Sequence, residues 1–252
     1  MTLCIDIGNT RTTFALMQHG AVIAHASESS RHLAFKKAQQ AVRALVAGAS
    51  PGSVTAAGIA SVVPFLTTLV VNAVKEEAAC DPIIITAETV KMNASYDEPA
   101  TIGADRLCNA AAAYALANGP AIVIDCGTAA TIDCVSASGE FIGGAILGGY
   151  RTAMRTLASN TALLPEIPFE KPAKALGDST VHCMQSGVIL GTTFAIEGIV
   201  RKIIDEAYTI VSPALFVTGG HHDIFSATTS LEVQPVPDLV LMGIELLTAK
   251  AR

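Results

Sequence analysis

The chain has 252 residues, of which 51% are hydrophobic and 15% charged, and its formal net charge is −6. A chain of this length buries enough surface to fold without disulfide or metal support, and its composition excludes an intrinsically disordered protein. The acidic balance argues against a basic surface that binds nucleic acid or anionic membranes. Aromatic residues make up only 5%, so the apolar content is mainly aliphatic, as in buried parallel strands covered by helices.

The first residues and the cysteines indicate a cytoplasmic protein. The opening segment has no basic stretch, and Asp6 interrupts its apolar run, which argues against a secretory signal. No apolar run reaches the roughly 18 residues that a membrane helix needs. The six cysteines form no C-x-x-C pair and lie mostly among aliphatic residues. That pattern is typical of reduced, buried thiols rather than of disulfides or a zinc site.

The chain begins with a strand–turn–strand pattern that recurs later. At an offset of 119 residues and without a gap, Asp6 is matched by Asp125 and Gly8 by Gly127. Each copy reads as an apolar strand, a tight turn, a second strand, a turn containing glycine and a third strand. Matches at one offset with the same order of strands predict two related halves. The further matched pairs are Thr12 with Thr131, Gly20 with Gly139, and Ile23 with Ile142.

Helical and strand patterns alternate through the rest of the chain. Apolar residues with a period of 3.6 mark the helices, and Pro or Gly marks several of their ends. This alternation predicts an α/β fold with sheets buried between helices. We place the boundary near Gly119, which gives an N-terminal half 1–118 and a C-terminal half 119–252. After the first hairpin, we expect strand 21–26, helix 38–46, strand 54–63, helix 64–79, strand 82–86, helix 106–117, strand 140–145, helix 150–163, helix 182–208, strand 214–218 and helix 239–249.

The two D-x-G turns are the main candidates for chemistry, because the Walker, Rossmann, zincin and α/β-hydrolase signatures are absent. An Asp at the end of a strand can bind Mg²⁺ directly or through water. Gly8 and Gly127 let the backbone approach a phosphate, and exposed turn amides can donate to its oxygens. The alternative is two ordinary hairpins, with Gly-Asn as a primed turn. The duplication favours function, because a turn alone does not require an Asp in both halves.

Two further segments keep two interpretations open. Asp105 opens a predicted helix, either as a stabilising first-turn acid or as a general base beside Arg106, whose guanidinium could clamp an anion. The segment 217–220 ends a late strand at Gly-Gly, either as a plain turn or as a nucleotide contact. The following pair, His221 and His222, is more typical of a polar helix start than of a metal site, since no third ligand is nearby.

Three short segments together resemble the signatures of type III pantothenate kinases, in the superfamily of actin, sugar kinases and heat-shock chaperones. They are 6–10, 103–106 and 125–131, and the resemblance spans nearly the whole chain. It implies two duplicated ribonuclease H-like (actin-like) domains, with mixed sheets flanked by helices. The sequence departs from the family pattern at Gly148-Gly149, where Pro-Gly is expected, and at Asp178, where a basic residue is common.

The resemblance implies ATP-dependent phosphorylation of pantothenate, the first step of coenzyme A biosynthesis, by a homodimer. Asp105 would be the catalytic base, Asp125 would hold K⁺ or NH₄⁺, and Asp6 is a candidate ligand for the Mg²⁺ that accompanies ATP. The implied ATP contacts are Asp6, Ile7, Gly8, Asn9, Thr10, Arg11, Thr12, Thr13 and Thr128. The implied pantothenate contacts are Tyr96, Gly103, Ala104, Asp105, Arg106 and Thr180.

Two alternatives remain. One is a kinase of the same superfamily that acts on another small substrate, because only Tyr96 and the segment 103–106 favour pantothenate. The other is a non-enzymatic regulator of the Bvg accessory factor type. The intact Asp6, Asp105 and Asp125 weigh against a loss of chemistry, and the acidic balance weighs against direct DNA binding.

Overall fold

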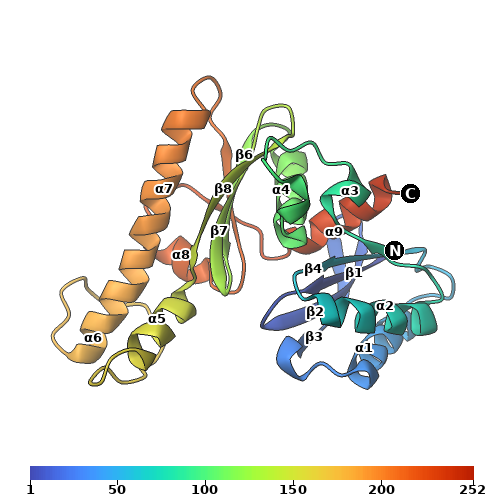
Figure 1. The fold of residues 1–252 in the computed structure, drawn as a ribbon, viewed down its shortest axis with the longest axis horizontal. Coiled ribbons are helices and arrows are strands. Elements are labelled where there is room, and N and C mark those ends of the chain that lie inside the picture. Colours follow the sequence, from blue (N-terminus) through green and yellow to red (C-terminus); the bar gives the residue numbers. More distant parts are fainter. The chain divides into compact units, whose positions relative to one another are not determined.

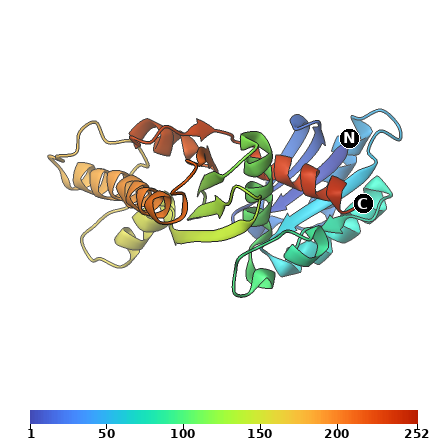
Figure 2. The same cartoon turned by 90° about the horizontal axis from the view of Figure 1, so that it is seen from above.

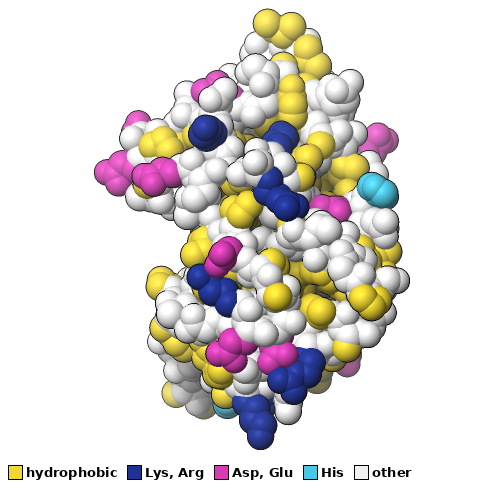
Figure 3. Space-filling model, turned by 90° about the vertical axis from the view of Figure 1, so that its right-hand side faces the viewer, with side chains coloured by type: hydrophobic (Ala, Val, Ile, Leu, Met, Phe, Trp, Pro, Cys, Tyr) yellow, Lys and Arg dark blue, Asp and Glu magenta, His cyan; other side chains and the backbone are white.

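The computed structural model describes residues 1–252 and divides into two compact units. The first unit comprises Met1–Leu116, Gly139–Phe141 and Asp238–Arg252, and the second comprises Ala117–Ser138 and Ile142–Pro237. Each unit is built on one five-stranded sheet (Figure 1). No helix has the length and apolar character required to cross a bilayer. On the face seen in Figure 3, Lys and Arg side chains are interspersed with Asp and Glu and form no basic stripe.

The first sheet has the order β3-β2-β1-β4-β5. Its first three strands are antiparallel neighbours, and β4 and β5 run parallel to β1. His19 and Gly20 join β2 to β3 with φ values of 52° and 79°, which suits a two-residue turn with the twist of the sheet. The parallel strands need helical crossovers. The elements are β1 (Thr2–Ile7), β2 (Arg11–Gln18), β3 (Ala21–Ser29), α1 (Phe35–Ala47), β4 (Ala56–Ser61), α2 (Pro64–Ala78) and β5 (Ile83–Ile84).

Alternate residues of β1 face two separate cores. Leu3 and Ile5 pack with the apolar faces of α1 and α2, whereas Cys4 belongs to a core formed with α4 (Ala104–Ala117) and α9 (Leu239–Lys250). This follows from the two-residue period of a strand. Figure 1 shows α1 beside α2 on one face, and Figure 2 shows α9 against the strands. The short α3 (Ala87–Val90) and the 3₁₀ turns Ser30–His32 and Pro99–Thr101 complete this unit.

The last helix belongs to the first unit, although it lies in the predicted half 119–252. Gly243 permits this packing, because a Cβ there would lie 2.0 Å from the carbonyl oxygen of Cys108 in α4. Gly58 in β4 similarly faces Thr248, whose Oγ1 would lie 1.9 Å from an added Cβ. The contacts therefore return the chain to the first sheet after residue 237. The domain division 1–118 and 119–252 stays a prediction.

The second sheet repeats the first in the order β10-β9-β6-β7-β8. A core on one of its faces is shared with α5, α7 and α8 and includes Tyr150 and Phe225, both fully buried. A π-helical turn, Ser186–Leu190, joins α6 to α7, so the chain is helical without a gap from 180 to 207 and the predicted helix 182–208 is confirmed. The elements are β6 (Ala121–Cys126), β7 (Ala129–Val135), β8 (Phe141–Gly148), α5 (Tyr150–Ser159), α6 (Thr180–Gln185), α7 (Gly191–Ala207), β9 (Ala214–Thr218), α8 (His222–Thr228) and β10 (Gln234–Pro235).

Strand pairing corrects the gapless repeat at the first turn. Asp6 pairs with Thr13, whereas Asp125 pairs with Thr131. The second turn is therefore one residue shorter, and Thr131 is the counterpart of Thr13 rather than of Thr12. The burial patterns of β2 and β7 agree, since both read exposed, buried, half-buried and buried from the first residue. The repeat of strands is real, but its offset changes by one residue within the turn.

Candidate active site

Hydrogen bonds from the buried residue Ser30 stabilise the first D-x-G turn, and the sequence motif gave no sign of this residue. Its Oγ donates to the carbonyl of Gly8 at 2.6 Å and bonds Thr12 Oγ1 at 2.9 Å. Its amide donates to the carbonyl of Thr10 at 3.0 Å, and the amide of Gly8 donates to the carbonyl of Arg11 at 3.0 Å. Each bond fixes part of the turn, so that its tip is shaped before any ligand binds.

The predicted ATP contacts of this hairpin differ in exposure. Asn9, Thr10 and Arg11 form the exposed tip, whereas Ile7 and Thr12 are completely buried. The tip is therefore open to solvent, whereas the hydroxyl of Thr12 is used inside the hairpin. The remaining predicted contacts, Asp6, Gly8 and Thr13, are half-buried.

The second turn packs against the start of α5. The amide of Gly149 and the Oγ1 of Thr152 donate to the carbonyl of Thr128 at 3.1 and 2.7 Å. A Cβ at Gly149 would lie 2.2 Å from the carbonyl oxygen of Gly127, whereas a Cβ at Gly148 would meet nothing within 4 Å. Gly149, which matches the glycine of the expected Pro-Gly pair, is therefore the one in close contact. Gly148, which stands where proline is expected, has open space around it.

The end of β9 lies against the carboxylate of Asp125. Gly219 has φ +84°, and a Cβ there would lie 2.3 Å from Asp125 Oδ1 and 2.7 Å from the amide nitrogen of Cys126. The amide of His221 donates to the carbonyl of Cys126 at 3.1 Å. The structure thus brings the segment 217–220, which sequence left as a turn or a nucleotide contact, directly to the second D-x-G motif.

Burial and two carboxylates of the first unit raise the pKa of the same thiol, that of Cys108. Burial raises the pKa of Cys108 well above its ordinary value, and the negative charges of Asp6 and Asp105 raise it further. Burial likewise raises the pKa of Cys126, with Asp125 adding to the effect. Both thiols therefore stay protonated, so neither is a nucleophile at neutral pH. Because the charges of Asp6 and Asp105 are both close enough to affect Cys108, the first D-x-G turn lies near the proposed base, Asp105.

Asp105 satisfies both interpretations of its position. It lies in the first turn of α4, where its Oδ1 accepts the amide of Arg106 at 2.8 Å, as a helix-stabilising acid does. Its Oδ2 makes no hydrogen bond to the protein. Gly103 gives it room, because a Cβ there would lie 2.5 Å from Asp105 Oδ1. One oxygen is therefore anchored, and the other remains able to accept a proton.

Phe141 joins two of the predicted pantothenate contacts. The guanidinium of Arg106 lies over its ring at 5.2 Å, and the ring of Tyr96 meets it edge-on at 5.9 Å. Backbone hydrogen bonds fix this ring, since Ser95 donates to its carbonyl and its amide donates to Asn93. Arg106 is only 7% exposed. The sequence pattern gave no sign of Phe141, because its partners are more than 30 residues away in the chain.

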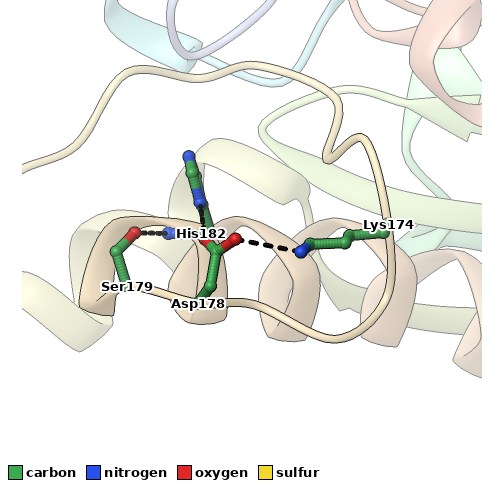
Figure 4. Close-up of polar contacts among 4 residues, drawn as sticks. All are labelled: Lys174, Asp178, Ser179 and His182. Carbon is green, nitrogen blue, oxygen red and sulfur yellow. Dashed lines mark hydrogen bonds and ion pairs between the residues drawn. The ribbon is translucent and has the colours of Figure 1, made fainter.

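Thr180 begins α6 beside a small charged cluster (Figure 4). Ser179 caps the helix by accepting the amide of His182 at 3.2 Å. Asp178 bonds the Nδ1 of His182 and the Nζ of Lys174 at 2.5 and 2.9 Å, and these contacts lower its pKa. The negative charge of Asp178, which stands where a basic residue is expected, is therefore compensated by hydrogen bonds from Lys174 and His182. Thr180 is exposed.

No group of three or more His, Cys, Asp or Glu side chains gathers to bind a metal ion. A Mg²⁺ or K⁺ ion at Asp6 or Asp125 would need most of its oxygen ligands from phosphate, backbone and water, as is usual for Mg²⁺ beside nucleotides. Single carboxylates at the ends of β1 and β6 fit that arrangement.

Comparison with known proteins decides the family. The family model described as type III pantothenate kinase matches residues 2–202. A type III pantothenate kinase of Desulfatibacillum aliphaticivorans is 34% identical over 98% of this chain and 97% of its own. One from Roseiflexus castenholzii is 35% identical over 98% of each chain. The chain belongs to the type III pantothenate kinase family. The resemblance stated from the three short motifs is confirmed.

Solved structures show the fold of this type III pantothenate kinase family member. A Baf family protein of Campylobacter jejuni has a TM-score of 0.64 and 17% identity over 98% of each chain. The (R)-2-hydroxyglutaryl-CoA dehydratase component A of Acidaminococcus fermentans has a TM-score of 0.59 and 11% identity over 100% of this chain and 99% of its own. At such identities the likeness concerns the fold alone. The predicted duplicated ribonuclease H-like fold is confirmed.

Proposed function

We propose that this chain transfers the γ-phosphoryl group of ATP to the primary hydroxyl of pantothenate, which gives 4′-phosphopantothenate in the first step of coenzyme A biosynthesis. Membership of the type III pantothenate kinase family is the observation that carries the proposal. The anchored carboxylate of Asp105, with one oxygen left to accept a proton, supports it. Phosphoryl transfer depends mainly on positioning and on charge stabilisation, so cations, turn amides and one base suffice.

Each part of the site has a defined task in this reaction. Asp105 accepts the proton of the substrate hydroxyl through Oδ2 while the hydroxyl oxygen bonds to phosphorus and ADP leaves. The tip 9–11 and the Gly127–Thr128 turn donate backbone amides to phosphate oxygens. Mg²⁺, when bound with ATP, would shield the phosphate charge, and Asp6 would hold it. Asp125 would hold K⁺ or NH₄⁺ at the second turn.

Pantothenate is placed by the side chains around Phe141. Tyr96 is 38% exposed beside this buried ring and provides a contact surface for the substrate. Arg106, already fixed over the ring, neutralises the substrate carboxylate without having to be ordered at the moment of binding. The remaining contacts come from Gly103, Ala104 and Thr180.

We also propose that the enzyme is a cytoplasmic homodimer. Several large apolar side chains of the second unit are exposed, which is a common property of surfaces that bind another protein. Static light scattering checks the proposal, and a monomeric mass at micromolar concentration would refute it. These side chains are Ile146, Leu157, Leu163, Leu176 and Phe194.

A substrate panel tests the activity. Release of ADP is measured with saturating ATP, Mg²⁺ and K⁺ for pantothenate and for other small hydroxyl and carboxyl compounds, and turnover is expected with pantothenate. Asp105→Asn should lower kcat by roughly 10²–10⁴ without changing the unfolding temperature. Glu88→Gln is the matched control, because Glu88 is also the second residue of its helix. No turnover with pantothenate in the native enzyme, or full activity of Asp105→Asn, would refute the assignment.

A further inference from the structure

Four side chains from three segments meet beside the second D-x-G turn. The Nε of Arg151 in α5 donates to His221 Nε2 at 3.1 Å. The ring of Phe169, from the loop before α6, lies 4.9 Å from the His221 ring and 4.9 Å below the Arg151 guanidinium. Tyr150 closes the cluster, with its ring 6.2 Å from those of Phe169 and His221. None of these residues belongs to the motifs that identified the family.

The hydrogen bonds of His221 select one form of its imidazole. Arginine can only donate, so Nε2 must accept, and the single ring proton of the neutral form lies on Nδ1. That nitrogen is 3.3 Å from the carbonyl of Cys126, which also accepts the His221 amide. Burial lowers the pKa of His221 and Arg151 lowers it further, against the opposing effects of the Cys126 carbonyl and of Asp223 in α8. The neutral form therefore fits the geometry.

The two carbonyls that flank Gly127 are consequently held by two different elements. His221, at the start of α8, holds the carbonyl of Cys126. The first turn of α5 holds the carbonyl of Thr128 through Gly149 and Thr152. The Arg151–His221 hydrogen bond joins these two elements directly. It closes a ring of contacts around the turn whose amides face phosphate in the proposed function.

We propose that Arg151 and His221 are positioning residues for the second phosphate-binding turn, holding α5 and α8 at a fixed spacing so that the Gly127 amide and the Asp125 carboxylate keep their places. This inference rests on the proposed function for its ligand, the polyphosphate chain of ATP. Neither residue needs to touch that ligand. Because the pair acts on the nucleotide side alone, its loss affects ATP and leaves pantothenate binding unchanged.

Two single variants and their combination test the proposal. Arg151→Met keeps the aliphatic stem on Phe169 but removes the donor. His221→Asn keeps a donor near the position of Nδ1 but cannot reach Arg151. Each should raise KM for ATP by about tenfold, with KM for pantothenate unchanged, because one charge-assisted hydrogen bond is lost. The double variant should be no worse than either single variant, since both break the same contact.

A conservative replacement and a neighbouring arginine complete the design. Arg151→Lys keeps a cationic donor and should recover most of the ATP affinity. Arg155→Met, one turn further along the exposed face of α5, should behave as the native enzyme. Additive losses in the double variant, an equal rise in both KM values, or the same effect from Arg155→Met would overturn the proposal. Binding of a non-hydrolysable ATP analogue by calorimetry gives the same comparison without turnover, so failure of the kinase assignment remains distinguishable.

Discussion

Replacing Gly219 with alanine should distort the second turn although it removes no functional group of the site. Gly219 has φ +84°, and an added Cβ would lie 2.3 Å from Asp125 Oδ1, 2.7 Å from the amide nitrogen of Cys126 and 2.8 Å from its carbonyl carbon. A carboxylate oxygen can rotate away, but the backbone atoms of Cys126 cannot. Because non-bonded contacts are most favourable beyond about 3.5 Å, relief needs a displacement of roughly 1 Å.

The expected losses follow from these two sources of strain. The left-handed backbone costs about 1–2 kcal/mol for alanine, and the steric overlap adds about 1–3 kcal/mol. In a chain of this size the unfolding temperature should fall by roughly 5–15 °C. A displacement of roughly 1 Å at the Asp125 turn should lower the phosphorylation rate by about 10² even where the protein is fully folded. The assays are thermal unfolding and ADP release at a temperature below the transition.

Gly220→Ala is the matched control, because a Cβ there meets nothing within 4 Å and its φ lies outside the left-handed region. It should retain the native unfolding temperature and rate. If Gly219→Ala behaves like Gly220→Ala, then the close approach of β9 to Asp125 does not support the site, and the reasoning is refuted.

Three further outcomes are expected. Ser30→Ala should raise KM for ATP several-fold and lower the unfolding free energy by about 1–2 kcal/mol, since it removes the bonds that shape the first turn; unchanged values of both would contradict this role. The reaction should require K⁺ or NH₄⁺ and should be abolished by Asp125→Ala, so equal rates in Na⁺ alone would count against cation binding. Burial raises the pKa of Glu197, but hydrogen bonds from Thr229 and Ser230 outweigh it and hold that pKa below its usual value. Its stabilising contribution is therefore present above about pH 4.3 and is lost as the pH falls through the lower folded value, so Glu197→Gln should flatten the acid decline of the unfolding temperature.

The regular elements could be predicted because each carries its own signal. The period of 3.6 predicted a helix at 38–46, and the structure has α1 at Phe35–Ala47. The short elements α3 and β10 were missed, because a segment of two to four residues is too short to show a period, whereas the start of α8 had been indicated by His221 and His222. The π-helical turn was missed for another reason, since its residues continue the helical pattern and only the hydrogen bonding changes.

The position of α9 could not be predicted from the local sequence, although the helix itself could. Its apolar pattern predicted a helix at 239–249, but nothing local tells which sheet the helix covers. The information lies in pairs that are distant in sequence, such as Gly243 against Cys108 and Thr248 against Gly58. The same holds at the site. Asp6, Asp105 and Asp125 stand in recognisable motifs, whereas Ser30, Phe141 and His221 act through partners far along the chain.

The two turns also show why glycine is present in both halves. Had the first turn been the primed Gly-Asn hairpin, its central residues would have positive φ, yet neither Gly8 nor Asn9 does. The requirement is space: a Cβ at Gly8 would lie 3.2 Å from the carbonyl oxygen of Arg11, and one at Gly127 would lie 3.2 Å from that of Ala129. The turns differ by one residue in length but share this close approach of backbone to backbone. Close backbone packing therefore accounts for a glycine in both turns, and the proposed function adds a second reason, since a site that binds its ligand through backbone amides needs the chain to approach that ligand closely.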